Sequence, residues 1–531
     1  MVYFISGAFL VTYGVAMITC GIPLFFQEIA VGQYLGSGGL TFVGQLAPLF
    51  KGVGFAAMTI VFFLDIYYCV IIAWTLYYIL SAFVAMPDIP WRYCGNTWNT
   101  INCSSIESSA TNIANNTKTP VEEFFDRNVL GITGGIEDVG GIQWKLLVCL
   151  IFGWTFIYIV IRNGLHQSGK IIWFTALFPY VVLFILLIRA ITLDGAMDGM
   201  YHFIIPRWEE LLKPEPWLEG ATQIFFAYNI GCAALPVLGS YNSFHHNFYK
   251  DAFITCIVNT LTSIVAGCVT FSILGYLALE KGTTVPEVVT SGPGLVFLTY
   301  PEVVLKLPWS MLWTLLFFFM LLVLGLDCGF CLVEAFIAGI LDNWSETLRP
   351  HKEVFRVVVC FIMFLLGIPM IMQGGMYVFQ LMDYYSASGM SLLWVCFFQT
   401  VAISWVFGTN RLSDCVEQML GFRPGKFWTI CWQYFAPFVM IIIFVAQCFQ
   451  FQPLTYGDSY EYPWWAKIIG FGLSFSSMMW IPFYAIFYLL KRPGTIWENL
   501  KEGLKPDIKL RRLSMRTKDK ILISESTVVD F

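Results

Sequence analysis

Five carboxylates stand inside or at the ends of long apolar stretches of this sequence: Glu28, Asp65, Asp327, Glu334 and Asp383. Lys and Arg are almost absent from the same stretches. An ionised carboxylate at the centre of a bilayer costs about 3 kcal/mol on insertion scales, so such residues normally face a cavity and have a partner. The pattern favours binding of a small metal cation or a cationic substrate. For Glu28 and Glu334, protonation or a hydrogen bond to a helix end explains the residue equally well.

Two local patterns sharpen this interpretation. In segment 324–329, Asp327 lies between two glycines. Glycine lets the backbone loosen, so carbonyl oxygens can join the carboxylate as ligands of a small cation. In segment 227–232, Asn229 and a glycine interrupt an apolar run, which is typical of a broken transporter helix, although close packing of two helices also explains it. Asp65 and Tyr68 stand three residues apart and share one helix face, for which lining a cavity is favoured over facing lipid.

Motifs for enzymatic chemistry are missing from the sequence. The five histidines, at positions 166, 202, 245, 246 and 351, fall in expected loops or at the ends of apolar runs. No P-loop, G-x-S-x-G or H-E-x-x-H motif occurs. The sequence therefore predicts transport or binding and not an enzyme.

The composition identifies the elements that must position these residues. Of the 531 residues, 58% are hydrophobic and only 12% are charged, with a mean hydropathy of +0.70. Soluble domains carry about 25% charged residues, so the chain is predicted to be an all-α polytopic membrane protein. The net charge of −5 and the lack of a large basic tract exclude a nucleic-acid footprint. About eleven runs are long enough to span a bilayer: 8–33, 54–84, 144–162, 171–190, 218–240, 252–279, 308–341, 356–373, 376–407, 428–452 and 465–490.

The distribution of basic residues predicts the orientation. The tail after residue 490 is rich in Lys and Arg, so it is expected in the cytoplasm. Counting spans backwards then puts loop 85–143 outside. That loop holds two glycosylation sequons, at Asn102 and Asn115, which require the external side. Cys94 and Cys103 share the same oxidising side and are predicted to form a disulfide, the alternative being two free thiols.

The same count puts Met1 outside the cell with no signal region before the first span. We expect one helix to be missing upstream; unusual insertion or a truncated gene model are the alternatives. The predicted organisation is a transmembrane domain over 1–490 and a cytoplasmic tail over 491–531.

Several motifs carry a family resemblance. The chain resembles the neurotransmitter:sodium symporter family, the sodium- and chloride-dependent transporters of amino acids, amines and GABA. The stretches 374–389 and 222–242 are most similar to the GABA, taurine and glycine branches. The matching segments, in family order, are 21–34, 67–74, 94–103, 222–242, 325–327 and 374–379.

The resemblance implies a fold of twelve helices in which the first ten form two five-helix inverted repeats. About eleven spans are expected here, because the first run is similar to the family's second helix. The family's first helix, which supplies half of each sodium site, is then absent, and uptake by the chain as written is expected to be impaired.

The resemblance also implies the site residues. One sodium site would use Asn259 and the carbonyl of Ala227, and the other Asp327, Cys328 and the carbonyl of Leu324. Ala227 and Cys328 replace hydroxyl residues of relatives, and a thiol is a poorer ligand for a hard cation. The implied chloride site comprises Tyr13, Gln223, Asn259 and Ser263.

The implied substrate pocket comprises Asp65, Tyr68, Phe226 and Asn229. Asp383 matches the acidic half of the outer gate, and Tyr241 and Asp342 match the inner gate.

The residues and the resemblance together support two functions. The first is sodium-coupled and chloride-coupled symport of a small amino acid, amine or GABA-like substrate by alternating access at the plasma membrane. The alternative is a non-transporting form that acts by assembling with other membrane proteins. Sodium and chloride ions, a small substrate and membrane lipid are the expected partners; assembly of identical copies is left open by the sequence.

Overall fold

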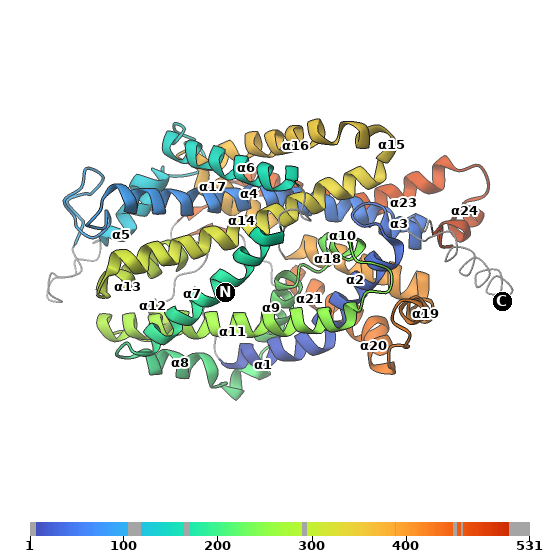
Figure 1. Ribbon diagram of the computed structural model, residues 1–531, viewed down its shortest axis with the longest axis horizontal. Coiled ribbons are helices and arrows are strands. Elements are labelled where there is room, and N and C mark those ends of the chain that lie inside the picture. The colour runs from blue at the N-terminus through green and yellow to red at the C-terminus, as the bar shows by residue number, and fades with distance from the viewer. Residues whose placement is uncertain are drawn as a thin grey trace.

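The computed structural model describes residues 7–104, 118–163, 169–288, 295–387, 389–449, 454–457 and 460–508. Nearly all regular structure in these ranges is helical. Strands β1 (Thr455–Tyr456) and β2 (Tyr460–Glu461) form a small antiparallel hairpin. Figure 1 shows the long helices running along the longest axis of the molecule, as expected for a bundle that crosses a membrane. The helices, in chain order, are α1 Gly7–Ala16, α2 Ile22–Leu35, α3 Phe42–Leu46, α4 Gly52–Val84, α5 Pro120–Glu123, α6 Trp144–Asn163, α7 Gly169–Ile191, α8 Ala196–Ile204, α9 Glu215–Ala227, α10 Ala234–Ser240, α11 Phe248–Lys281, α12 Val285–Val288, α13 Tyr300–Lys306, α14 Ser310–Asn343, α15 Ser345–Leu348, α16 Lys352–Gly367, α17 Gly375–Tyr385, α18 Met390–Val401, α19 Thr409–Leu420, α20 Lys426–Ile430, α21 Ala436–Phe449, α22 Trp464–Met478, α23 Trp480–Lys491 and α24 Ile496–Gly503.

Hydropathy predicted the spanning elements well. Within the described ranges, nine helical stretches are long and apolar enough to cross a membrane. A tenth is added if α22 and α23, which are bent by 46° relative to each other, count as one span. The predicted run 218–240 is not one helix, because α9 and α10 are separated by the non-helical segment 228–233. The nine stretches contain α1 with α2, α4, α6, α7, α11, α14, α15 with α16, α17 to α19, and α20 with α21.

The centre of the bundle is the pair α4 and α14, which lie side by side (Figure 1). Apolar residues surround α4 on all sides, and such a helix must be buried by its neighbours. Aromatic rings fill the contact: Tyr78 stacks on Phe318 with centroids 4.6 Å apart, and Trp91 packs on Tyr78 at 5.0 Å. Helices α6 and α16 cover the outer side of α4. The pair thus forms a rigid support for the residues that α4 and α14 carry.

Glycines bring α2 close to α10. A Cβ atom added to Gly32 would lie 2.1 Å from the carbonyl oxygen of Pro236, so no other residue fits without displacing backbone. Gly39 has a φ of +61° and approaches Gly339 of α14 equally closely. Small residues at such crossings let helix backbones approach in membranes. This packing fixes the position of α10 and of the segment that precedes it.

The loop after α4 is held by a disulfide and by one buried carboxylate. The predicted Cys94–Cys103 disulfide is present. Glu123 of α5 is 1% exposed and accepts hydrogen bonds from the Thr100 backbone (2.9 Å) and hydroxyl and from the Asn99 amide at 3.1 Å. Burial alone would raise the pKa of the Glu123 carboxyl, but these hydrogen bonds outweigh burial and lower its pKa below the ordinary value. Of the two predicted sequons, Asn102 is exposed, whereas Asn115 lies outside the described residues.

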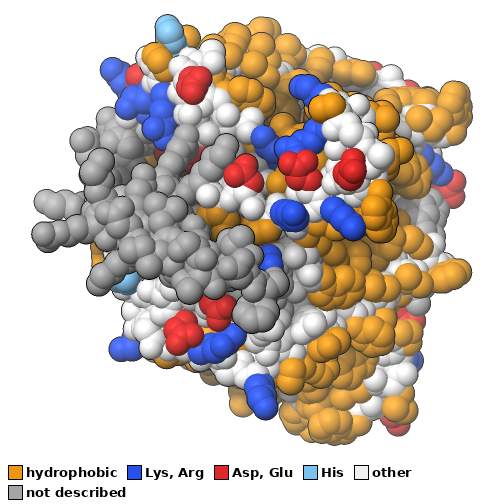
Figure 2. All heavy atoms as spheres, turned by 90° about the vertical axis from the view of Figure 1, so that its right-hand side faces the viewer, with side chains coloured by type: hydrophobic (Ala, Val, Ile, Leu, Met, Phe, Trp, Pro, Cys, Tyr) orange, Lys and Arg blue, Asp and Glu red, His pale blue; other side chains and the backbone are white. Residues whose placement is uncertain are grey.

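The opposite end of the molecule carries α24, which folds back towards the start of α4. The backbone N–H of Asp507 donates to the carbonyl of Gln45 at 2.8 Å, and Asn499 donates to the carbonyls of Leu489 and Arg492. Figure 2 views this end and shows basic and acidic side chains gathered on it beside hydrophobic flanks. The charge distribution is that of a membrane protein surface that meets water.

Candidate functional site

The predicted helix interruption is present between α9 and α10. Asn229, Gly231 and Ala233 have φ values of +53°, +81° and +54°, a left-handed conformation that ends regular helix geometry. Backbone groups of this segment bond to other helices instead. The Gly231 N–H donates to Glu28 at 2.8 Å, and the Ile230 carbonyl accepts from the Cys396 thiol at 3.0 Å. The broken helix is thus anchored by α2 on one side and α18 on the other.

Glu28 has partners that sequence reasoning did not identify. Its Oε1 also accepts a hydrogen bond from Gln399 Nε2 at 2.7 Å. Both side chains are almost fully buried, at 1% and 2% exposure. The two residues are 371 positions apart, so nothing in the local sequence pattern could pair them. The Glu28 carboxyl is thus hydrogen-bonded to the backbone of the non-helical break between α9 and α10.

Asn259 of α11 faces the end of α9, as expected for the first sodium site. Its amide nitrogen donates to the Ala227 carbonyl at 3.4 Å. Its Oδ1 atom is buried and has no hydrogen-bond partner among the described residues. A buried amide oxygen without a donor next to a helix-end carbonyl is the kind of oxygen pair that a small hard cation accepts. The donor set fits sodium, with Ala227 contributing only its backbone.

Asp327, at the second implied sodium site, lies between two helices. Its Oδ1 accepts a hydrogen bond from the Thr175 hydroxyl of α7 at 2.9 Å. The neighbouring Cys328 thiol interacts with the Tyr68 hydroxyl of α4. Leu324, the expected carbonyl ligand, lies on the same helix and has a side chain that is 42% exposed. Thr175 is a residue of this site that the sequence did not reveal.

The implied chloride residues are only partly brought together. The Tyr13 hydroxyl of α1 lies beside the side chains of Ser263 and Thr260 on α11. Thr260, which sequence reasoning missed, also bonds to the Tyr228 hydroxyl at 2.9 Å. Gln223 is on the exposed side of α9, and no hydrogen bond joins it to the others within the described part of the chain.

The implied substrate residues come from α4 and from the region of the break, and they differ in burial. Tyr68 and Asn229 are partly buried, and Phe226 is 42% exposed. Asp65 is 1% exposed, and neither of its carboxylate oxygens has a hydrogen-bond partner among the described residues.

The thiols of Cys69, Cys328 and Cys360 lie close enough to Asp65 to interact with its charge. The Cys328 thiol thus interacts with both Tyr68 and Asp65, and Asp65 is the more deeply buried of these two residues.

Asp383 of α17, the residue expected at the outer gate, lies beside the Tyr67 hydroxyl of α4. The two residues share no sequence motif, and helix packing alone brings them together.

Tyr241, expected at the inner gate, interacts with Glu334, whose carboxylate lies 3.9 Å from Arg356 of α16. Both charged side chains are only 11% exposed. Asp342 pairs with Arg349 at 3.6 Å. Both Glu334 and Arg356 stand out in the sequence, but the sequence did not show that they pair.

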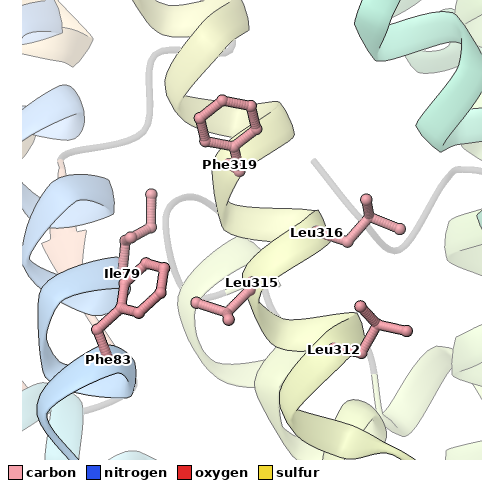
Figure 3. A pocket seen from close by; sticks show the side chains of 6 residues that line it. All are labelled: Ile79, Phe83, Leu312, Leu315, Leu316 and Phe319. Carbon is pink, nitrogen blue, oxygen red and sulfur yellow. The ribbon is translucent and has the colours of Figure 1, made fainter.

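A separate apolar pocket lies between α4 and α14 (Figure 3). Its volume is about 240 Å³. No side chain that lines it can bond to an ion or to a charged substrate, so it is not the site described above. The lining residues are Ile79, Phe83, Leu312, Leu315, Leu316 and Phe319.

The chain is similar along most of its length to known membrane transporters. The family model described as "Sodium:neurotransmitter symporter family" matches residues 5–492. The human sodium- and chloride-dependent creatine transporter 1 is 42% identical over 527 residues, which cover 97% of this chain and 82% of that protein. The rat sodium- and chloride-dependent GABA transporter 2 is 41% identical over 506 residues, which cover 94% of this chain and 84% of that protein. These relatives are transporters and not enzymes. The chain therefore belongs to the sodium:neurotransmitter symporter family, whose members depend on sodium and chloride.

Proposed function

We propose that this protein moves a small amino acid, amine or GABA-like molecule across the plasma membrane together with sodium and chloride. The observation that carries the proposal is the unpartnered, buried Oδ1 atom of Asn259 beside the Ala227 carbonyl. The relatives named for creatine and GABA support a small substrate.

Sodium would bind at two places next to the broken helix. Asn259 and the Ala227 carbonyl would supply neutral oxygens at the first. Asp327 would supply a full negative charge at the second, where Thr175 already orients one carboxylate oxygen. Because the sodium ion balances the negative charge of Asp327, its binding lowers the free-energy cost of an ionised carboxylate in the membrane. Cys328 would contribute little directly, because a thiol is a soft ligand.

Chloride would bind near Tyr13 and Ser263, which already lie beside each other. Gln223 would complete that site only after its side chain turns towards α11. The substrate would bind at the break, where backbone groups that no longer belong to a helix are available to charged ends of a small molecule. Tyr68, Phe226 and Asn229 would form its walls.

Alternating access would open the site to one side at a time. We assign Asp383 and Tyr67 to the outer barrier and the group of Tyr241, Glu334 and Arg356 to the inner one. The loop over 85–143 would face the outside, and the basic tail over 491–531 the cytoplasm, by the positive-inside rule. The charged end in Figure 2 would then be the cytoplasmic end.

A second candidate function is assembly with other membrane proteins without transport. Ala227 and Cys328 favour it, because neither offers a hydroxyl oxygen to a cation. The two candidates differ in whether the Asp327 carboxylate is needed for activity.

Uptake by purified protein in liposomes tests the proposal. Labelled creatine, GABA and glycine would be offered with sodium or potassium outside and with chloride or gluconate. We expect sodium-dependent uptake of at least one compound at a low rate, in keeping with the impaired uptake expected from the sequence. That uptake should be lost in Asp327→Asn and unchanged in Asp198→Asn, a matched control at an exposed aspartate of α8. Folded protein that takes up none of the compounds in a sodium-dependent way would favour the assembly function.

A further inference from the structure

Two buried oxygen atoms without partners lie beside the break in the broken helix. Glu28 of α2 and Gln399 of α18 are joined at one end by the 2.7 Å hydrogen bond from Gln399 Nε2 to Glu28 Oε1. The Gly231 N–H donates to the same Oε1 atom at 2.8 Å. The other oxygen of each group, Glu28 Oε2 and Gln399 Oε1, is buried and has no hydrogen-bond partner among the described residues.

An ionised Glu28 would be costly in these surroundings. A buried polar atom without a partner costs about 1–3 kcal/mol, and more when it is charged. The ionisable groups that act on this carboxyl are the thiols of Cys232, in the break, and Cys396, on α18. Helix α10 carries no titratable side chain, and no group of α11 or α19 in the described ranges acts on Glu28. No positive charge from the described residues is therefore present there to balance an anion.

We propose that Glu28 binds a proton and, as a carboxylic acid, forms a doubly hydrogen-bonded pair with the Gln399 amide. The acid O–H on Oε2 donates to Gln399 Oε1, while Gln399 Nε2 donates to Glu28 Oε1. The single added proton gives a partner to both unpartnered oxygens. A Gln399 amide turned by 180° would still require this proton, because Gln399 Oε1 and Glu28 Oε1 would then face each other at 2.7 Å.

The proton would act on the broken helix through Gly231. A neutral acid still accepts the Gly231 N–H with Oε1, so one proton joins α2, the break and α18. Loss of the proton would leave an anion whose Oε2 faces the carbonyl oxygen of Gln399. The Glu28 carboxylate and the Gln399 amide would then separate. The Gly231 N–H would lose its hydrogen bond to Glu28 unless the break moved together with Glu28. Binding of the proton therefore stabilises the observed contact between α2, the break and α18.

Infrared difference spectroscopy of the full chain in lipid tests the proposal without any transport assay. At neutral pH the wild-type protein is expected to show a carboxylic acid C=O stretch that shifts in D₂O. Glu28→Gln should lack this band, and Asp65→Asn should keep it, which separates Glu28 from the other buried carboxyl without partners. Gln399→Leu should keep the band at higher frequency, because the C=O group loses the amide donor.

An acid C=O band that is the same in Glu28→Gln and the wild type would overturn the proposal. The Glu28→Gln protein is expected to fold, since a glutamine at 28 can donate to Gln399 Oε1 just as the acid does. If it does not fold, the Gln399→Leu spectrum decides: an unshifted acid band, or none, means that Glu28 does not pair with Gln399 as an acid. Because the readout is the protonation state at rest, it is independent of whether the protein transports.

Discussion

The hydroxyl of Thr175 on α7 donates a 2.9 Å hydrogen bond to Oδ1 of Asp327 on α14, across 152 residues of sequence. Both groups are in the membrane-spanning part of the bundle, where a hydrogen bond to a carboxylate replaces hydration. The contact fixes the direction of one carboxylate oxygen before any cation arrives. Thr175 is therefore expected to position the ligand and not to bind the ion itself.

Replacing Thr175 with Val should weaken sodium binding, because Val keeps the shape of the Thr side chain but lacks its hydroxyl group. Loss of the hydrogen bond leaves Asp327 free to rotate, and we expect the sodium concentration for half-maximal uptake to rise about fivefold, equivalent to about 1 kcal/mol. Thr175→Ser should restore the wild-type value. Sodium titration of uptake in liposomes measures both variants. An unchanged titration in Thr175→Val would show that this hydrogen bond does not prepare the site.

Hydropathy and composition were enough to predict the spans, because a lipid environment requires long apolar runs wherever the chain crosses it. The disulfide was also predictable, since Cys94 and Cys103 lie near each other in a polar loop that the positive-inside rule predicts to be external. The position of the break followed from Asn229 and the glycine beside it. These features depend on local sequence, which a single chain reveals.

The partners of the buried carboxylates could not be predicted. Whether Glu28 meets Gln399, or Glu334 meets Arg356, depends on how each helix is rotated and which helices touch, and these are set by packing between distant segments. The same holds for Asp65. Its spacing from Tyr68 predicted a shared face, but only the structure shows that both residues interact with Cys328 of α14.

The Glu123 carboxylate should make the loop after α4 sensitive to acid. Its pKa is lowered in the folded protein, so its contribution to stability is complete above the unfolded value of about 4.3 and is lost as the pH falls through the folded value. Proteolysis of the loop should therefore speed up when the pH drops from about 7 to about 3. Glu123→Gln should be cleaved faster at neutral pH and should lose most of this pH dependence. Equal cleavage of the two proteins at neutral pH would contradict the stabilising role.

Glycan attachment at the loop should not depend on Asn102 alone. The Asn102 carbonyl and the Ser104 N–H both bond to the backbone of Lys118, so the sequon that contains Cys103 is held in place once the loop folds. Asn115 is the predicted main site. Asn102→Gln should still shift on a gel after glycosidase treatment, and Asn115→Gln should lose most of the shift. A band of Asn102→Gln that glycosidase leaves unchanged would mean that Asn102 carries the glycan.

Asp65 is expected to select the charge of the substrate. Its buried carboxyl has no hydrogen-bond partner among the described residues and shares the neighbour Cys328 with Tyr68, so a cationic group that enters beside Tyr68 would favour the charged form of Asp65. An unpaired buried charge is costly, and a cationic substrate would relieve that cost. Asp65→Asn keeps the shape of the side chain and removes its charge. It should weaken the binding of cationic amines by about 1–3 kcal/mol and leave the binding of neutral and zwitterionic compounds unchanged or stronger.

Competition of lysine, an aromatic amine, glycine and GABA against a labelled substrate measures this ranking, with Asp198→Asn as the surface control. If all four compounds keep their wild-type order in Asp65→Asn, the charge of Asp65 is balanced within the protein by a proton or by sodium. Tyr68 and the break would then discriminate between substrates without its help.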